Sequence, residues 1–352
     1  TTGIVRRAPR STQYTATAAY GSGKTNEPQL KMAEKAKIAI LISGRGSNMA
    51  AMVYAAKSSD CPFEIVLVAS NDPDASGLQL AEAEGVPTFS HPHRGLKRND
   101  HDAVMHEAVV AAGAEYIVLA GYMRILSDGF VRKWADHMLN IHPSLLPKYT
   151  GRDTYQRSRD AGDKCAGCSV HLVTPELDDG PVLAQTEVAI LPDDDAERLA
   201  GRILIAEHQL YPATVAKYVT READPDWILA QVRERALALA ETHERASFGA
   251  PGWRVGSEKN GKYFAYFARS HFGEADIAVL VKTAGLDEQA ALIAAEPELY
   301  YTPKFYGKAG WIASRLDTGR TDWDNSESRL YSSWCQVGPK RLTKMIAIAD
   351  QF

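Results

Sequence analysis

An asparagine and a histidine two residues apart form the first pattern in this chain that could do chemistry. They are Asn140 and His142 in the segment NIHPSLLP (140–147), whose two prolines predict a rigid, extended loop after a strand that ends at Leu139. On an extended backbone both side chains point the same way. An amide donor beside an imidazole suits the stabilisation of a developing oxyanion and proton transfer, although an isolated Asn-x-His can also be a purely structural pair.

A pair of neighbouring aspartates, Asp178 and Asp179, could hold such an imidazole in place. They lie in an acidic turn that follows a strand-like segment containing Val170, Leu172 and Val173. A carboxylate close to an imidazole favours its protonated form and fixes its orientation. The spacing allows this role for either aspartate, and a solvated acidic turn is the alternative.

A glycine-containing turn, SGRGSN (43–48), could bind a phosphate group. It lies directly between the first strand-like segment and a helix-like one. Gly44 and Gly46 would let the backbone approach a ligand closely, and a helix start presents free N–H groups to an anion. A dinucleotide site would have a third glycine where Met49 stands, so the pattern favours a single phosphate over a pyrophosphate. A structural tight turn is the alternative.

The cysteines give no metal site in the sequence. Cys165 and Cys168 form a lone Cys-x-x-Cys without a second ligand pair, so we predict that no metal is bound. The four cysteines of the chain are too few and too scattered for a disulfide scaffold, which favours a reducing, cytoplasmic setting.

Short apolar segments must position these groups. Residues 37–42, 64–69 and 116–120 have the pattern of buried strands, and helical spacing follows, as in residues 49–57 and 101–112. Strands that alternate with helices predict an α/β fold with a mostly parallel, doubly wound sheet covered on both faces. Ligands bind beyond the carboxyl ends of the strands in such sheets.

The whole chain is long enough for two domains. It has 352 residues, and a single hydrophobic core seldom grows beyond roughly 250 to 300 residues. Its 40 basic and 44 acidic side chains give a formal net charge of -4, which argues against sequence-independent nucleic-acid binding. No uncharged apolar run approaches roughly 18 residues, so we expect no membrane-spanning segment.

Three segments differ in composition. Residues 1–31 hold five basic residues and one acidic residue without an apolar period, and we predict a disordered or non-native N-terminal extension. Residues 32–222 contain the strand–helix alternation. Residues 223–352 hold 17 of the 30 aromatic residues and short alternating segments between two helix-like ends, which predicts a second α+β domain with an antiparallel sheet. The polar stretch 219–225 is the predicted linker.

Residues 37–220 resemble the phosphoribosylglycinamide formyltransferase family, folate-dependent enzymes of de novo purine synthesis. The resemblance implies the formyltransferase fold. Seven segments match in the family's order and cover nearly the whole domain: ISGRGSN (42–48), ASNDP (69–73), LAGYMRILS (119–127), LNIHPSLLPKY (139–149), SVHLVT (169–174), LDDGP (177–181) and EHQLYP (207–212).

The resemblance implies roles for residues of five of these segments and for Arg98. The residues that would hold glycinamide ribonucleotide are Gly46, Ser47, Asn48 and Glu207. Those that would line the pocket of the co-substrate 10-formyltetrahydrofolate are Arg98, Met123, Arg124, Ile125, Leu126 and Asn140. The implied catalytic set is Asn140, His142 and Asp178, which selects Asp178 over Asp179, and no metal is implied.

One loop departs from the family's pattern. After Lys148 and Tyr149 the family usually has a glycine and then a Leu-(His/Asp)-Thr-His run, whereas this chain reads GRDTY (151–155). Arg152 and Tyr155 thus replace an apolar residue and a histidine. The packing of this loop and its substrate contacts are therefore expected to differ.

The activity that the resemblance implies is formyl transfer from 10-formyltetrahydrofolate to the amine of glycinamide ribonucleotide. The amine would attack the formyl carbon directly, with Asn140 and protonated His142 stabilising the oxyanion and Asp178 orienting His142 or an ordered water. Formyl transfer to an amino-sugar nucleotide or to methionyl-tRNA is the alternative, as is formyltetrahydrofolate hydrolysis. We expect small-molecule substrates and a monomer or homodimer.

Residues 223–352 more loosely resemble the MmcQ/YjbR family, whose fold is called CyaY-like. The family has been suggested to bind DNA, but 16 basic and 17 acidic residues in this segment argue against phosphate-driven binding. We expect its aromatic residues to form a core rather than a base-stacking platform. A binding protein that acts through this module is the alternative to an enzyme. The matching pieces are residues 247–255, 261–265, 310–312 and 338–342.

Overall fold

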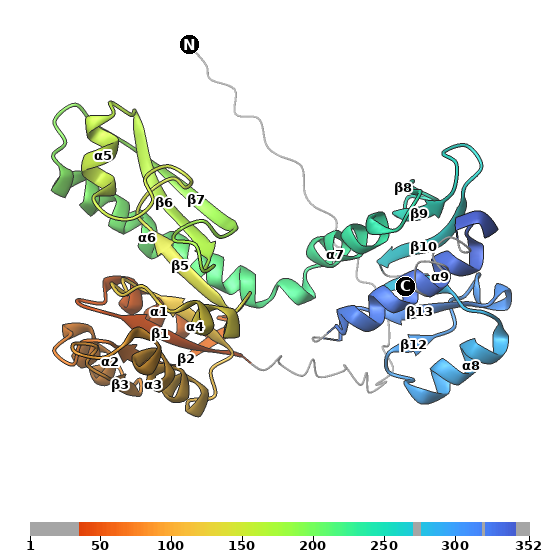
Figure 1. Cartoon of the computed structure of the whole chain (residues 1–352), viewed down its shortest axis with the longest axis horizontal. Helices are drawn as coiled ribbons and strands as arrows, with labels where there is room; N and C mark the ends of the chain where they lie inside the picture. The colour runs from red at the N-terminus through yellow and green to blue at the C-terminus, as the bar shows by residue number, and fades with distance from the viewer. Residues whose placement is uncertain (1–34, 270–275, 319–320, 343–352) are drawn as a thin grey trace, which may run out of the picture. The chain divides into compact units, whose positions relative to one another are not determined.

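The computed structural model describes residues 35–269, 276–318 and 321–342, which form two β-sheets and their helices (Figure 1). The predicted N-terminal extension, residues 1–31, lies outside the described residues. Within the described ranges, no helix is both long and apolar enough to cross a membrane.

The first sheet of the described chain has seven strands in the order β3-β2-β1-β4-β5-β6-β7. The strands are β1 (Ala36–Ile42), β2 (Phe63–Ser70), β3 (Thr88–Ser90), β4 (Tyr116–Leu119), β5 (Met138–His142), β6 (Cys165–Leu172) and β7 (Val182–Ala189). The helices between and after them are α1 (Ser47–Ala56), α2 (Ser76–Ala83), α3 (Arg98–Ala111), α4 (Asp128–Lys133), α5 (Thr154–Asp160) and α6 (Ala196–Val219).

Strands β1 to β5 are parallel, whereas β6 and β7 are antiparallel to their neighbours. The mostly parallel α/β sheet predicted from the sequence is therefore confirmed. Residues 38–42 of β1 are fully buried, because helices cover both faces of the sheet. Ile40 and Leu139 belong to the core that also contains residues of α1, α2 and α6, and Leu41 and Met138 belong to the core with residues of α3.

The chain reverses its winding direction between β1 and β4. β1 lies between β2 and β4 in the sheet, so the turns that follow β1 and β4 lie side by side at a topological switch point, where α/β sheets bind ligands. The strand register aligns Leu41 with Leu119 and Leu119 with Asn140. Adjacent strands are about 4.8 Å apart, so Asn140 lies about 10 Å from the end of β1. Both lie at the carboxyl end of the parallel strands, which is called the sheet edge below.

Strand β5 is longer than predicted from the sequence. The strand was expected to end at Leu139, but it continues to His142 because β6 pairs with it in antiparallel register, Asn140 opposite His171 and His142 opposite Ser169. The prediction that Asn140 and His142 lie in a loop is therefore wrong. The proline-containing loop begins only at Pro143.

The connection between β6 and β7 folds back along the sheet. The N–H of Val173 donates to the carbonyl oxygen of Met138 (2.9 Å), and the N–H of Leu172 donates to that of Pro181 (3.0 Å). Gly180 packs directly on this strand, since a Cβ atom there would lie 1.9 Å from the Leu172 carbonyl oxygen. The tight return brings residues 174–179 back over the β5–β6 pair.

The second sheet has six strands within the described ranges, all antiparallel, in the order β12-β13-β11-β10-β9-β8. Its strands are β8 (Thr242–Glu244), β9 (Gly252–Val255), β10 (Lys262–Arg269), β11 (Ile277–Lys282), β12 (Tyr300–Tyr301) and β13 (Trp311–Arg315). Its helices are α7 (Pro225–Ala238), α8 (Leu286–Ala295) and α9 (Trp323–Val337), with 3-10 turns η1 (Arg221–Ala223) and η3 (Gly307–Ala309).

Aromatic side chains fill the core of the second sheet. The fully buried ones are Trp253, Phe264, Phe267, Tyr300 and Trp334, and they pack with residues of α7 and α9. The predicted antiparallel sheet with helices at both ends of the segment is confirmed. The exact boundary between the two predicted domains stays a prediction.

Candidate active site

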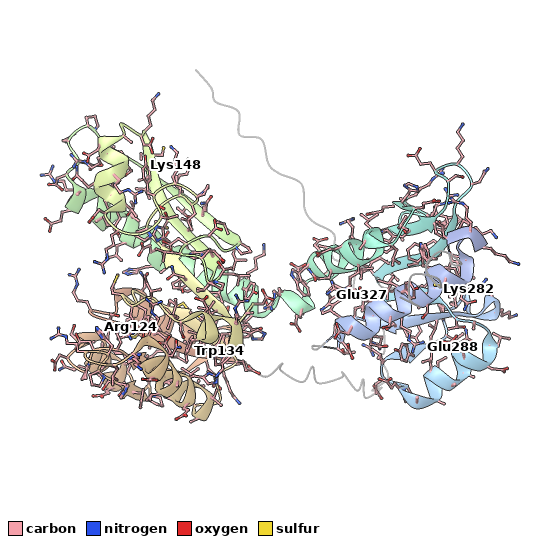
Figure 2. All side chains as sticks on the ribbon, viewed as in Figure 1. Arg124, Trp134, Lys148, Lys282, Glu288 and Glu327 are labelled. Atoms are coloured by element: carbon pink, nitrogen blue, oxygen red, sulfur yellow. The ribbon has the colours of Figure 1, made fainter. Side chains whose placement is uncertain are left out.

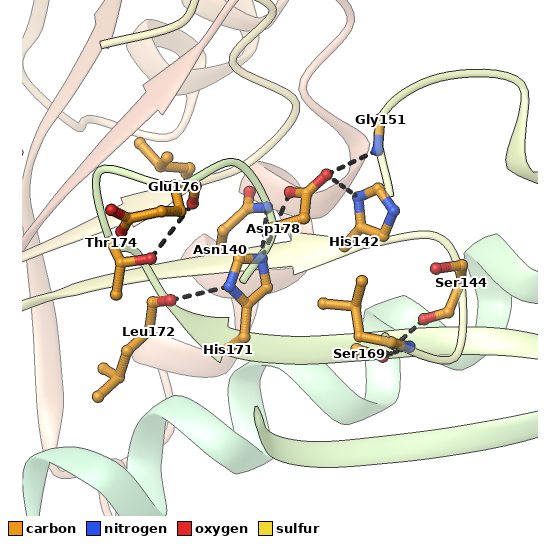
Figure 3. Close-up of polar contacts among 12 residues, drawn as sticks. Asn140, His142, Ser144, Gly151, Ser169, His171, Leu172, Thr174, Glu176 and Asp178 are labelled. Carbon is orange, nitrogen blue, oxygen red and sulfur yellow. Dashed lines mark hydrogen bonds and ion pairs between the residues drawn. The ribbon is translucent and has the colours of Figure 1, made fainter. Parts of the chain in front are cut away.

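Three polar side chains project from one face of the β5–β6 pair (Figure 3). Asn140 lies opposite His171, and residues that face each other across antiparallel strands point to the same side of the sheet. His142 lies two residues after Asn140 and therefore shares this side, as the spacing predicted. The intervening Ile141 points into the hydrophobic core.

His142 lies between two hydrogen-bond acceptors. Its Nε2 atom is 2.9 Å from the carbonyl oxygen of Tyr149, and its Nδ1 atom is 3.4 Å from a carboxylate oxygen of Asp178. A carbonyl oxygen only accepts, so Nε2 must carry a hydrogen in this contact. The imidazolium form, with hydrogen on both nitrogens, satisfies both contacts at once, and this arrangement suits a proton donor.

His171 has the opposite arrangement. Its Nδ1–H donates to the carbonyl oxygen of Leu172 (2.8 Å), and its Nε2 accepts from the side-chain amide of Asn140 (3.1 Å). Nε2 therefore carries no hydrogen, and the ring is neutral. Burial of the ring lowers the pKa of His171, which agrees with this tautomer. The amide nitrogen of Asn140 has a second hydrogen, which this geometry leaves for a bound oxygen.

The sequence-based site did not include His171. The signal that could have identified it is the alternation of Ser169 and His171 with apolar residues in a strand, because polar residues at every second position mark one face.

Asp178 lies between the two imidazoles. One carboxylate oxygen accepts the backbone N–H of Gly151 (2.8 Å) and faces His142, and the other lies 3.7 Å from Nε2 of His171. Its φ of 54° places the residue in the left-handed region, where aspartate is better tolerated than most residues. Asp179 is exposed. Of the two aspartates that the spacing left open, the structure brings Asp178 to the imidazoles.

The glycine turn after β1 packs against a second turn. Gly46 precedes α1 with a φ of 72°, and the N–H of Gly77 in α2 donates to the carbonyl oxygen of Gly44 (3.0 Å). A Cβ atom on Gly77 would lie 2.6 Å from a methyl carbon of Ile42 and 3.2 Å from Cα of Gly46. Gly77 therefore fixes the shape of the turn, and sequence reasoning did not identify it.

Asn48 and Glu207 form a buried polar pair next to the glycine turn. The Asn48 amide donates to a carboxyl oxygen of Glu207 (2.7 Å), and the two residues are 9% and 5% exposed. Burial raises the pKa of Glu207, and the Asn48 hydrogen bond opposes that effect. The side-chain oxygen of Asn48 is buried and has no hydrogen-bond partner within the described ranges. Gly46, Ser47, Asn48 and Glu207, which the family resemblance assigned to one substrate, thus lie together.

Helix α6 holds Glu207 in position through Tyr211, one turn further along. The hydroxyl of this fully buried tyrosine lies within hydrogen-bond distance of the carbonyl oxygens of Leu119 (3.0 Å) and Leu139 (2.9 Å). These carbonyls belong to β4 and β5, so α6 is fixed to both strands close to Asn140.

The segment after β4 offers an uncovered apolar surface at the same edge. Met123 and Ile125 are 70% and 56% exposed, whereas Leu126 is buried. The N–H of Met123 donates to Oγ of Ser43 (2.7 Å), which joins this segment to the turn after β1. Arg124 extends from the same segment (Figure 2), and its Nε atom is buried without a partner among the described residues.

Arg98 is exposed at the first turn of α3. One turn later, a carboxylate oxygen of Asp102 accepts the N–H of Ser127 (2.7 Å), so this end of α3 adjoins the segment that contains Met123. The expected folate residues are therefore grouped around the turn after β4, and only Asn140 comes from another strand.

The loop that departs from the family's pattern is partly buried. Tyr155 packs against the core that contains α1 and α6, and Arg152 is exposed. Burial raises the pKa of Tyr155, and the negative charge of Glu207 adds to this effect, so the phenol lies near the buried Asn48–Glu207 pair. No group of three or more potential metal ligands occurs in the part of the chain that the structure describes.

The glycine turn after β1, the pair Asn140 and His142 on β5, and Asp178 in the β6–β7 connection form one candidate site on a mostly parallel sheet. The chain belongs to the formyl transferase family, which matches residues 36–215. The phosphoribosylglycinamide formyltransferase of Haemophilus influenzae is 41% identical over 180 residues, which are 51% of this chain and 85% of that protein. Residues 237–336 match the YjbR family. Both resemblances stated from the sequence are thus confirmed.

The chain is also similar to longer purine biosynthetic proteins and to solved formyltransferase structures. The trifunctional purine biosynthetic protein adenosine-3 of Drosophila melanogaster is 39% identical over 223 residues, or 62% of this chain, but the match spans only 16% of that protein. The crystal structure of phosphoribosylglycinamide formyltransferase from Brucella melitensis is 45% identical with a TM-score of 0.51, and the match covers 53% of this chain and 96% of that one.

Proposed function

We propose that this protein transfers a formyl group from 10-formyltetrahydrofolate to the amine of N1-(5-phospho-D-ribosyl)glycinamide, a step of purine biosynthesis. The observation that carries the proposal is the group of Asn140, His142 and Asp178 at the same sheet edge as the glycine turn. The names of the relatives with this architecture support the choice of substrate.

The phosphoribosyl end of the substrate would bind at the glycine turn. The first N–H groups of α1 have no partner within the helix and attract an anion, and a Cβ atom on Gly44 in the same turn would meet nothing within 4 Å. The unpaired oxygen of Asn48 and the carboxyl group of Glu207 are acceptors for hydroxyl or amine hydrogens of the ligand. The amine would then point along the sheet edge toward Asn140.

10-Formyltetrahydrofolate supplies the formyl carbon that the amine attacks. Met123 and Ile125 present the uncovered apolar surface that a flat pterin ring would bury, and the unpartnered Nε–H of Arg124 is a donor beside it. The described residues therefore fit a folate, with its formyl end toward β5.

Asn140 and His142 would stabilise the negative charge that develops on the formyl oxygen. The second amide hydrogen of Asn140 and the Nδ1–H of His142 are the donors on this face. The Nδ1 contact with Asp178 is 3.4 Å, longer than an ordinary hydrogen bond, so a bound oxygen can take over this hydrogen with a small movement. Donors aimed at developing charge in a buried site are a large term in catalysis.

Asp178 and His142 would carry out the two proton transfers of the reaction. As the C–N bond forms, the attacking nitrogen loses a proton, and the departing folate nitrogen gains one. Asp178 can accept the first proton, directly or through a water, and His142 can deliver the second. Asp178 also holds the His142 ring in place, whereas neutral His171 keeps the Asn140 amide in its orientation.

The direct test is an assay with synthetic N1-(5-phospho-D-ribosyl)glycinamide and 10-formyltetrahydrofolate, measuring release of tetrahydrofolate. We expect turnover that depends on both substrates. Parallel assays replace the amine substrate with an amino-sugar nucleotide, with methionyl-tRNA or with water. A higher kcat/KM for any of these, or no turnover with the glycinamide, would refute the proposal.

A further inference from the structure

The backbone of the loop of residues 148–153 contacts both His142 and Asp178. The carbonyl oxygen of Tyr149 accepts the Nε2–H of His142 (2.9 Å), and the N–H of Gly151 donates to Asp178 (2.8 Å). The position of the imidazole therefore depends on the position of one carbonyl group. Rotation of the ring about its Cβ–Cγ bond would turn Nδ1 away from Asp178, and the Tyr149 carbonyl opposes this rotation.

The conformation of Tyr149 is unfavourable for its residue type. Its φ of 57° lies in the left-handed region, which a bulky side chain seldom occupies. A cavity of about 450 Å³ adjoins the loop and is lined by Tyr149, Lys148 and Asp163, among others. Close packing thus does not hold this part of the loop, and polar contacts must do so.

Asp163, which follows α5, supplies those contacts. Its carboxylate accepts the hydroxyl of Tyr149 (2.8 Å), and each carboxylate oxygen accepts from the ammonium of Lys148 (3.2 Å; Lys148 is labelled in Figure 2). The hydrogen bonds from these two side chains lower the pKa of Asp163, so the group is a carboxylate at neutral pH.

Arg157 of α5 holds the loop from a second direction. Its guanidinium carbon lies 5.3 Å from the centre of the Tyr149 ring, and one of its nitrogens donates to the carbonyl oxygens of Thr150 (2.6 Å) and Arg152 (3.2 Å). Residues of α5 and of the turn after it thus fix the side chain of Tyr149 at its ring and at its hydroxyl.

We propose that Tyr149 and Asp163 are positioning residues for His142. Asp163 fixes the phenol, the fixed phenol keeps the Tyr149 backbone in its left-handed conformation, and that conformation aims the carbonyl at Nε2 of His142. Neither side chain touches the imidazole. The inference rests on the proposed function, because it assigns the pair a part in that reaction.

The test compares Tyr149→Phe, Asp163→Asn and Asp163→Ala with wild type in steady-state kinetics. Tyr149→Phe should lower kcat about two- to tenfold, the range expected for one hydrogen bond, and change KM for either substrate less than about twofold. Asp163→Asn retains an acceptor oxygen and should stay close to wild type. Asp163→Ala frees both Lys148 and Tyr149 and should lower kcat by about tenfold or more.

The chain offers a matched control on the other side of the same domain. The hydroxyl of Tyr54 donates to Glu84 (2.9 Å), and Lys57 contacts the same carboxylate and lies 5.4 Å from the Tyr54 ring centre. Tyr54→Phe therefore removes the same kind of bond from the same kind of group, away from the site. It should leave kcat and KM unchanged.

A second readout does not require activity. The Nε2–H of His142 should give a slowly exchanging imidazole signal in NMR, identified by its loss in His142→Gln, and Tyr149→Phe and Asp163→Ala should broaden or abolish it. Wild-type kcat and an unchanged signal in both variants would overturn the inference. An inactive wild-type chain whose signal still depends on Asp163 would overturn the proposed function alone.

Discussion

At the scale of single residues, one carboxylate lies between two histidines that differ in the hydrogen bonds of their Nε2 atoms. Nε2 of His142 faces a carbonyl oxygen, which requires a hydrogen there, whereas Nε2 of His171 accepts from Asn140. Asp178 lies closer to Nδ1 of His142 (3.4 Å) than to Nε2 of His171 (3.7 Å). In the proposed mechanism, His142 is the proton donor beside the path of the formyl group.

His142→Ala should lower kcat far more than it changes KM for either substrate. The imidazolium interacts most strongly once charge has developed on the formyl oxygen, so its loss affects the transition state more than substrate binding. We expect a reduction by a factor of about 10² to 10⁴, measured by steady-state kinetics. A variant with wild-type kcat would contradict the proposed mechanism.

The two neighbouring aspartates provide an internal control for that prediction. Asp178→Asn removes the negative charge beside His142 and should lower kcat by about 10². Asp179→Asn changes an exposed side chain and should stay within about twofold of wild type. Equal damage from both substitutions would mean that the assignment within the Asp-Asp turn is wrong.

Glu207→Gln should make the stability of the formyl transferase domain less dependent on pH. Burial raises the pKa of Glu207, so the fold favours its protonated form, and stability is lost as pH rises through the folded-state pKa. Glutamine stays neutral and can still accept from Asn48. We expect its melting temperature to exceed that of wild type by about 2–4 °C at about pH 8 and to match it at about pH 4.

The substitution should at the same time raise KM for the glycinamide substrate, because Glu207 belongs to the proposed binding site. Glu197→Gln, which replaces an exposed side chain near the start of the same helix, is the control for the melting experiment. Its melting temperature should show no increase over wild type that depends on pH. If the Glu207→Gln and wild-type melting curves shifted in parallel with pH, the buried carboxyl group would not be the cause.

At the scale of elements, the site depends on how turns and strands meet. The turn after β1 contacts α2 backbone to backbone at Gly77, and β5 receives its last residues only through pairing with β6. Each contact joins segments that are distant in the sequence. The positions of the site's side chains therefore depend on contacts between elements, which the local sequence does not determine.

Gly77→Ala should disturb the glycine turn and weaken binding of the glycinamide substrate. The added methyl group would lie 2.6 Å from Ile42 and 3.0 Å from the Gly44 carbonyl oxygen, so the turn must shift. We expect KM for this substrate to rise about tenfold or more and the melting temperature to fall, while KM for the folate changes little. Kinetics at varied concentrations of each substrate and thermal melting measure these effects.

Gly201→Ala is the matched control for this change. Gly201 lies inside α6, and a Cβ atom there would meet nothing within 4 Å. Alanine is favoured over glycine inside a helix by about 1 kcal/mol, so this variant should be as active as wild type and slightly more stable. A similar rise in KM for both variants would exclude the steric explanation.

The sequence predicted elements better than the contacts between them. The apolar strands, their helices and the face shared by Asn140 and His142 follow from local periodicity. The end of β5 did not, because its last residues pair with a strand more than 20 residues further along the chain. Neither did the place of Gly77, since close approach between separate segments leaves no local signal, and the alternation around His171 marks its face but not its partner Asn140 on β5.

At the scale of the whole molecule, the two matched families occupy separate stretches of the chain. The formyl transferase match ends at residue 215 and the YjbR match begins at residue 237, with the end of α6, η1 and most of α7 between them. Every residue of the candidate site lies in the first stretch. Each sheet also has a hydrophobic core of its own.

A chain of residues 32–222 should therefore fold and turn over without the second module. All side chains of the proposed mechanism, and the described helices that contribute to the two cores of the first sheet, lie within that span. We expect kcat and KM within about threefold of the full chain and a cooperative thermal transition. A soluble, folded but inactive fragment would show that the second module contributes to the site.

The pairing of β5 with β6 has a consequence at the level of the gene. Side chains alternate between the faces of a strand, so one codon gained or lost between Met138 and Asn140 would turn Asn140 and His142 toward the core that contains Ile141 and bring Ile141 to the face of the candidate site. Only changes by pairs of codons would preserve the face. The neighbouring loops can gain or lose any number of residues without this effect. We therefore expect related sequences to differ in length in these loops and not in β5.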